Sequence, residues 1–87
     1  MTDTPTADEI AAHFSAMDDS VTLINATVAD DTSALGMHGT AAEVKLMVTR
    51  NTDHLEIQAA KDWYVASSVS KTAYAGAVTA GKAYVAG

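Results

Sequence analysis

Three histidines, His13, His38 and His54, are the side chains of this 87-residue chain whose ordinary pKa permits acid–base chemistry near neutral pH. No two of them are four residues apart, the spacing at which one helix face presents a pair of metal ligands. A metal site would need distant segments to converge, with Asp53 or the Asp30-Asp31 pair as further ligands. Ordinary surface histidines explain the pattern more simply, and we expect no metal site.

The other motifs that could carry chemistry are incomplete. The Asp18-Asp19 and Asp30-Asp31 pairs lack the alternating oxygen ligands of a calcium-binding loop. The segment from Gly76 to Lys82 follows no predicted strand and has no hydroxyl residue after the lysine, so it is not a phosphate-binding loop. Without cysteine there is no thiol nucleophile and no thiolate metal site. We therefore expect a protein that is not an enzyme and has no cofactor.

Asp19-Ser20-Val21 is similar to the Asp-Ser-Leu motif of acyl carrier proteins, small acidic helical domains whose prosthetic arm is attached to that serine. Here the serine lies within a predicted helix, few residues precede it, and valine replaces leucine. A carrier domain is therefore the less favoured interpretation.

Helices must position these residues, and the first is predicted over residues 7–34. Thr6 and Glu9 match a capping box, in which each side chain accepts a hydrogen bond from the other residue's backbone amide at a helix start. Apolar residues then recur at spacings of four and three, which is typical of a helix that packs against other helices. They are Ile10, Phe14, Met17, Val21, Ile24 and Val28. The pattern leaves the end of this helix open between Asp30 and Leu35.

A second helix is predicted over residues 41–63, after a turn formed by Gly36 and Gly39. Thr40 and Glu43 match a second capping box at its start. Its predicted buried face contains two amides among apolar residues: Val44, Met47, Val48, Asn51, Leu55 and Gln58. Buried amides in such a stripe fix helix register or oligomeric state at some cost in stability.

Residues 65–70 are small or β-branched and are predicted to form a connector, with a short strand as the minor alternative. A third helix is predicted over residues 72–86. Ala73, Ala77 and Gly81 are four residues apart on it, and such small side chains let a neighbouring helix approach closely.

These elements predict an all-α fold: a helical hairpin of two long antiparallel helices with a shorter third helix, arranged as an up-down-up bundle. Residues 1–5 form a polar N-terminal arm, and residues 6–87 form a single helical domain. The third helix is too short to cover the first along its whole length. We therefore expect part of the apolar stripe to pack against another chain, and the protein to be oligomeric.

The composition supports shared packing. Leucine, isoleucine, valine and phenylalanine number only sixteen, against eighteen alanines, so a small chain has little apolar surface to bury as a monomer. The net charge of -6 is the wrong sign for binding nucleic acid directly. With no membrane segment and no signal peptide visible, a cytoplasmic location is expected.

Charge is unevenly distributed along the chain. Residues 1–43 contain eight acids and no lysine or arginine, whereas residues 44–87 contain three acids and five bases. The first part thus has a net charge of -8 and the second of +2. This polarity favours complementary contacts, either between helices of one chain or between neighbouring copies. A solvated acidic face is the simpler alternative.

The later part of the chain resembles small helical structural or assembly proteins of tailed bacteriophages. The resemblance is carried by Arg50 to Glu56 and, after a variable connector, by Ala73 to Gly87 with Ala-Val-Thr-Ala-Gly-Lys-Ala-Tyr at its centre. It implies a virion protein, made in the host cytoplasm, that works by packing against itself and other structural proteins of a capsid, head-tail or tail assembly.

We therefore expect a non-enzymatic structural protein; the alternative is a small acidic regulatory or carrier domain that binds a basic protein. Aromatic residues are the strongest candidates for interface anchors. The candidate interface residues are Trp63, Tyr64, Tyr74 and Tyr84 as anchors, His38 in the turn, and Asn51 for register.

Overall fold

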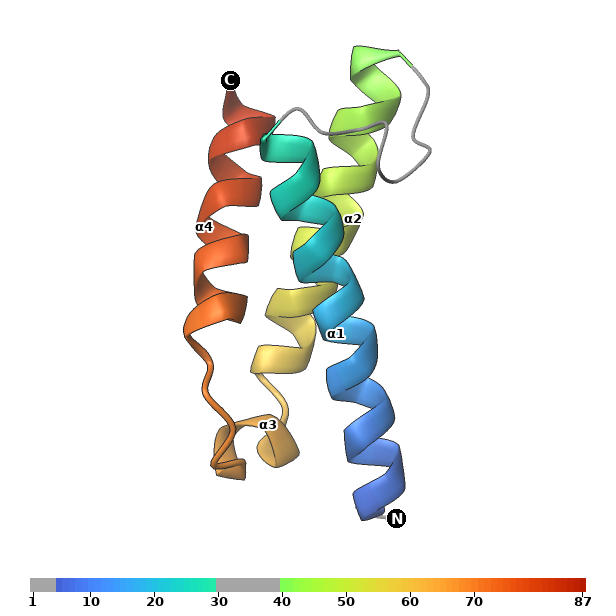
Figure 1. The fold of residues 1–87 in the computed structure, drawn as a ribbon, viewed down its shortest axis with the longest axis vertical. Coiled ribbons are helices and arrows are strands. Elements are labelled where there is room, and N and C mark those ends of the chain that lie inside the picture. The colour runs from blue at the N-terminus through green and yellow to red at the C-terminus, as the bar shows by residue number, and fades with distance from the viewer. Residues whose placement is uncertain (1–4, 30–39) are drawn as a thin grey trace.

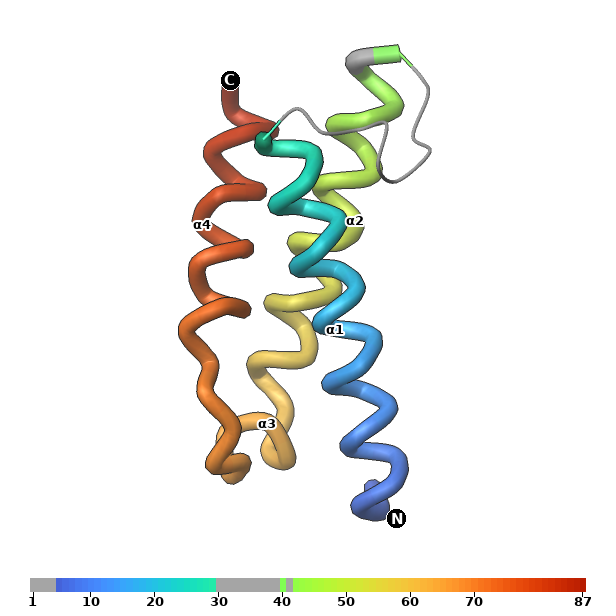
Figure 2. The backbone as a smooth tube through the Cα atoms, viewed as in Figure 1, coloured from blue at the N-terminus to red at the C-terminus, as the bar shows by residue number. Residues whose placement is uncertain are grey.

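The computed structural model describes residues 5–29 and 40–87, except for the side chain of Ala41. These residues form helices and no strands, and the helices pack together, which confirms the predicted all-α class (Figure 1). The helices are α1 (Ala7–Val28), α2 (Ala41–Ala59), α3 (Asp62–Ala66) and α4 (Thr72–Ala86). The long helices α1, α2 and α4 lie side by side, and α3 lies at the same end of the bundle as the start of α1 (Figure 2).

Both predicted capping boxes are present, so both helix starts are confirmed. The Thr6 amide donates to Glu9 Oε1 at 2.8 Å, and the Glu9 amide donates to Thr6 Oγ1 at 3.2 Å. Thr40 and Glu43 repeat the arrangement, with distances of 3.0 and 3.2 Å. The hydrogen bond from each threonine backbone amide to the carboxylate, and then the threonine side chain, favour the ionised form and lower the pKa of both glutamates.

The first helix is shorter than predicted. α1 ends at Val28 and Ala29 is its C-terminal cap, so the helix does not run unbroken to residue 34. Two acids, Asp30 and Asp31, follow in the sequence, and carboxylates near the negative C-terminal end of a helix dipole disfavour its extension. The rest of this prediction, with the glycine turn and His38, lies outside the described residues.

The second helix also ends earlier than predicted. α2 stops at Ala59, and extended backbone at Lys61 separates it from the five-residue α3. Seven residues are about two helical turns, so on an unbroken helix Tyr64 would follow Ile57 on the exposed side. After the break Tyr64 is instead buried, with 6% of its surface exposed, while Ile57 is 58% exposed. Burial of this aromatic ring outweighs continuation of the helix.

The core lies where α1, α2 and α4 meet, and α3 closes one end. The buried apolar residues of this core are Met17, Ile24, Val48, Leu55, Tyr64, Tyr74 and Ala77. Partly buried residues of the predicted stripes, such as Phe14 and Val21, pack around them. Three small polar residues are buried as well: Ser20, Thr27 and Thr52. Val28, predicted to be in the stripe, is 43% exposed.

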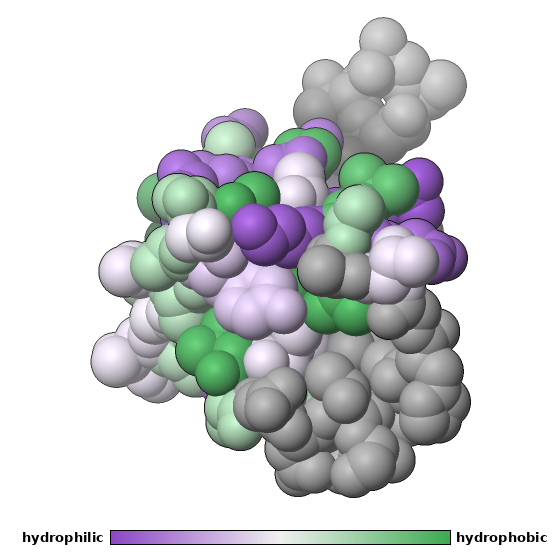
Figure 3. All heavy atoms as spheres, turned by 90° about the horizontal axis from the view of Figure 1, so that it is seen from above, coloured by the Kyte–Doolittle hydropathy of each residue, from purple (hydrophilic) through white to green (hydrophobic). Residues whose placement is uncertain are grey.

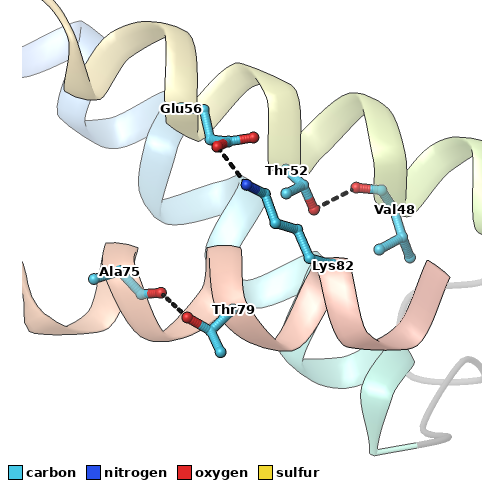
Figure 4. A network of polar contacts seen from close by, with 6 residues as sticks. All are labelled: Val48, Thr52, Glu56, Ala75, Thr79 and Lys82. Carbon is cyan, nitrogen blue, oxygen red and sulfur yellow. Dashed lines mark hydrogen bonds and ion pairs between the residues drawn. The ribbon is translucent and has the colours of Figure 1, made fainter. Parts of the chain in front are cut away.

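The small-residue stripe of the third helix is confirmed at two of its three positions. Ala77 and Gly81 are buried, whereas Ala73 is exposed. A Cβ atom on Gly81 would overlap Thr52 Oγ1 on α2, so α4 and α2 approach closely at this point. Thr52 and the neighbouring contacts between α2 and α4 are drawn in Figure 4.

None of the helices in the described ranges combines the length and the apolar character needed to cross a bilayer.

Candidate functional site

A polar cluster of three side chains joins α1 to α2. Ser20 is 4% exposed, and its Oγ lies 2.9 Å from Asn51 Oδ1 and 2.9 Å from His54 Nδ1. Asn51 and His54 are three residues apart on one side of α2, and both face the serine. A serine, a histidine and an amide therefore meet beside the core, as in some nucleophilic sites.

The hydrogen bonds of Asn51 determine where the protons in this cluster lie. Asn51 Nδ2 donates to Met47 O at 2.9 Å, so the amide oxygen must point toward Ser20. The single hydroxyl proton of Ser20 then goes to Asn51 Oδ1, and His54 Nδ1 must carry a proton that it donates to Ser20 Oγ.

The proton arrangement rules out activation of Ser20 by His54 in this geometry. A general base must accept the nucleophile's proton, whereas here the histidine donates and the serine proton points toward an amide. Ser20 is also buried in the middle of α1, where attachment of a prosthetic arm would require the helices to separate. The cluster is suited to setting the register of α1 against α2.

An aromatic cluster lies at the α3 end of the bundle. The Phe14 ring is 5.4 Å from Trp63, 5.8 Å from Tyr64 and 5.9 Å from Tyr74, measured between centroids. His13 stacks on Trp63 at 4.9 Å with an angle of 14° between the rings. Edge and offset contacts of this kind add stability beyond the buried area. The cluster therefore ties α3 and α4 to the first turns of α1.

The two buried tyrosines have perturbed acidity. Burial raises the pKa of Tyr64. Burial, together with a 2.6 Å hydrogen bond from its hydroxyl to Asp18 Oδ1, raises the pKa of Tyr74 to about 12. Both rings are thus part of the core of their own chain.

The predicted interface residues occupy different environments. Tyr64 and Tyr74 are buried, Trp63 and Tyr84 are partly exposed, and Asn51 bonds Ser20 within the chain. His38 lies outside the described residues. Their predicted role in an interface stays a prediction, with Trp63 and Tyr84 the aromatic rings that retain exposed surface.

A groove of about 530 Å³ runs between α2 and α4 and reaches α3. Leu55, Tyr74 and Val78 form part of its apolar wall. Lys71 lies at its edge, where the ammonium donates to Ser67 O at 2.7 Å and lies 5.5 Å from the centre of the Tyr64 ring. The ammonium group of this lining residue is therefore held by contacts within its own chain.

Charge pairing does not follow the division between the two parts of the sequence. Within the described ranges the ion pair is Lys82 Nζ to Glu56 Oε2 at 2.7 Å, which joins α4 to α2 (Figure 4). Both side chains are well exposed, so the pair contributes little stability. The acids of α1 accordingly keep exposed surface: they are Asp8, Glu9, Asp18 and Asp19.

Large aliphatic side chains are exposed on the side of α2 and toward both ends of the bundle. The exposed fractions are 43% for Val28, 50% for Leu46, 58% for Ile57, 67% for Val65 and 48% for Val69. These five are nearly a third of the sixteen leucine, isoleucine, valine and phenylalanine residues. Large apolar residues are therefore scarce in this chain, and many of them are nevertheless exposed to water. In the end-on view, the described residues show polar and apolar side chains interspersed (Figure 3).

Sequence reasoning missed the Ser20–His54 contact, although a signal for it existed. Met17, Ser20, Ile24 and Thr27 recur at spacings of three, four and three, so both hydroxyl residues lie on the stripe of the two buried apolar ones. Among the described residues, no three side chains of histidine, aspartate or glutamate are grouped as a metal site would require.

No protein-family model, curated protein or solved structure matches this chain.

Proposed function

We propose that this chain is a non-enzymatic structural or assembly protein that acts through helix packing, in a homo-oligomer or on a larger particle. The observation that carries the proposal is the exposure of large aliphatic side chains. Leu46 and Ile57 on α2, and Val65 and Val69 at the α3 end of the bundle, all present apolar surface to water. Burying such side chains against a further surface is favourable, and exposed apolar patches mark sites of protein–protein interaction.

The polar chemistry of the chain supports the same function. The cluster around Ser20 is satisfied by hydrogen bonds inside the chain and leaves no activated nucleophile. Every buried polar side-chain atom of the described residues has a hydrogen-bond partner. The proposed bundle places α1, α2 and α4 in up-down-up order, in keeping with the course of the chain in Figure 1, which presents rigid helix faces on its sides.

A component of a tailed-phage virion is the specific form of this proposal. It follows from the resemblance of residues 50–56 and 73–87 to small phage structural proteins. The partners are then further copies of the chain and the structural proteins of a capsid, head-tail junction or tail. Trp63 and Tyr84, which retain exposed ring surface, are the proposed aromatic anchors toward such partners.

Sedimentation of particles tests the proposal. A tagged chain is produced in the cells that naturally make it, and large particles are separated from free protein on a density gradient. The chain is expected in the particle fractions, at a constant ratio to the other structural proteins. The proposal is overturned by absence from those fractions together with a monodisperse 9.0 kDa species in light scattering at every concentration tested.

The exposed acids of α1 favour one alternative, an acidic regulatory domain that binds a basic protein. α1 contains Asp8, Glu9, Asp18 and Asp19 and no lysine or arginine. Such a complex would form between a cationic partner and the isolated chain, and it would weaken steeply with added salt. Particle association that persists in high salt would instead support the structural function.

A further inference from the structure

The side of α2 that faces away from the core has its own regular pattern. Leu46, Arg50, Asp53 and Ile57 follow one another at spacings of four, three and four residues, and all four are exposed. We call this set the outer α2 face. The core residues Val48, Thr52 and Leu55 lie on the opposite side of the same helix. α2 therefore has two helix-packing stripes, and the chain itself covers the inner one.

The outer α2 face is complementary to itself. If two copies of α2 are placed antiparallel about a two-fold axis between residues 51 and 52, residue numbers that sum to 103 lie opposite each other. Leu46 then faces Ile57 of the other copy, and Arg50 faces Asp53 of the other copy. The two-fold generates each contact twice, giving aliphatic contacts at both ends and opposite charges in the middle.

The spacing of this face matches an antiparallel coiled-coil contact. Spacings of four, three and four place the residues alternately at the two inward positions of a heptad, and each facing pair combines one of each kind. A parallel arrangement in the same register would instead place Arg50 against Arg50 and Asp53 against Asp53. Repulsion between like charges disfavours that orientation, so the charges specify the antiparallel one.

We propose that a second copy of this chain docks antiparallel on the outer α2 face, through paired Leu46–Ile57 and Arg50–Asp53 contacts. This inference rests on the proposed assembly function and names one of its contacts. The face is short, about three helical turns, so the buried area is well below the roughly 1,200 to 2,000 Å² of a stable interface. Dimerisation of the isolated chain is accordingly weak, and it strengthens where many copies are held together.

Charge reversal gives a sharp test of the contact. Arg50→Asp places carboxylates opposite one another, and Asp53→Arg places guanidinium groups opposite one another, so each variant should lose about tenfold or more in self-affinity. The double variant Arg50→Asp/Asp53→Arg restores opposite charges and should recover dimerisation. A mixture of the two single variants should form a heterodimer, because all its facing charges are opposite.

Analytical ultracentrifugation over a wide concentration range measures these affinities, with the wild-type mass rising from 9.0 kDa toward twice that value. Circular dichroism and thermal unfolding check that the exposed substitutions leave the fold intact. Equal self-association of the wild type and the single variants overturns the inference, as does failure of the mixed variants to associate. If the chain still enters particles in either case, the proposed function stands and another face makes the contact.

Disulfide formation tests the orientation separately, because the natural chain has no cysteine. Leu46→Cys and Ile57→Cys chains should crosslink to each other when mixed and oxidised. In the antiparallel arrangement two copies of position 46 are about 16 Å apart, which no disulfide can span. Efficient crosslinking of Leu46→Cys to itself, with none in the mixture, contradicts the proposed orientation.

Discussion

Gly81 of α4 faces Thr52 of α2 at a separation that leaves no room for a Cβ atom on the glycine. The Cβ would overlap Thr52 Oγ1 and would also lie 3.4 Å from Thr52 Cβ and 3.5 Å from Ile24 Cγ2. Rotation of the threonine would relieve the overlap only by breaking its 2.8 Å hydrogen bond to Val48 O. Three helices therefore meet at a point where the absence of a side chain is required.

Gly81→Ala should lower the free energy of unfolding by about 1–2 kcal/mol, because the overpacking outweighs the better helix propensity of alanine. Gly76→Ala is the matched control on the same helix. A Cβ there would meet nothing within 4 Å, so this variant should be more stable by about 0.5–1 kcal/mol. Urea unfolding measures both changes, and equal effects at the two positions would contradict the close approach.

Ser20→Ala should destabilise the chain through the polar cluster. The substitution removes the acceptor for His54 Nδ1 and the donor for Asn51 Oδ1. Leaving buried polar groups unpaired costs about 1–3 kcal/mol, and because Asn51 and His54 are partly exposed we expect a loss near the lower end of that range. Ser15→Ala, at an exposed position of α1, isolates the change in helix propensity. Denaturant unfolding should show a lower free energy of unfolding for Ser20→Ala than for Ser15→Ala. Equal values would mean that the polar cluster does not stabilise the fold.

Loss of stability at high pH should depend on Tyr74. Its pKa is raised to about 12 in the folded chain from 10.0, so the folded state retains the phenol proton longer than the unfolded state. The contribution is present below pH 10 and is lost as the pH rises toward 12. Tyr74→Phe should therefore flatten the decline in unfolding free energy over this interval. Tyr84→Phe leaves the hydrogen bond between Tyr74 and Asp18 intact, so its unfolding free energy should decline with pH as in the wild type.

The Glu9 carboxylate offers a test at low pH. Its pKa is lowered from 4.5 because the Thr6 backbone amide and side chain hydrogen-bond to the ionised form. The contribution to stability is present above pH 4.5 and is lost as the pH falls through the lowered pKa. Thr6→Ala removes the side-chain hydrogen bond and keeps the backbone donor, so NMR titration should show the Glu9 pKa moving part of the way up toward its ordinary value. An unchanged pKa would mean that the Thr6 side chain does not act on the Glu9 carboxylate in solution.

Local signals in the sequence predicted much of the fold. The capping boxes at Thr6 and Thr40 marked the starts of α1 and α2, because each box depends on residues three positions apart. The boundaries that failed depend on contacts across the molecule. The break at Lys61 exists because Tyr64 gains burial against Phe14 of α1, and no property of residues 60–64 alone indicates that partner.

The candidate sites were predicted less well, for a related reason. Ser20 and His54 are 34 residues apart, so their contact has no local signal in the sequence beyond the place of Ser20 on the α1 stripe. The outer α2 face is less apparent than the inner one, because only two of its four residues are apolar. Its signal, four residues at spacings of four, three and four, is present in the sequence.

The hydrogen bond between Asp18 and Tyr74 joins residues 56 positions apart, and Tyr74, Ala77 and Gly81 all lie among the last fourteen residues. During translation, the surfaces of α1 and α2 that these residues cover stay exposed until α4 has been synthesised. A prematurely terminated chain that lacks α4 leaves core residues such as Met17 and Leu55 accessible to proteases. Resistance of the chain to proteolysis thus depends on α4, which is synthesised after the two helices whose core residues it covers.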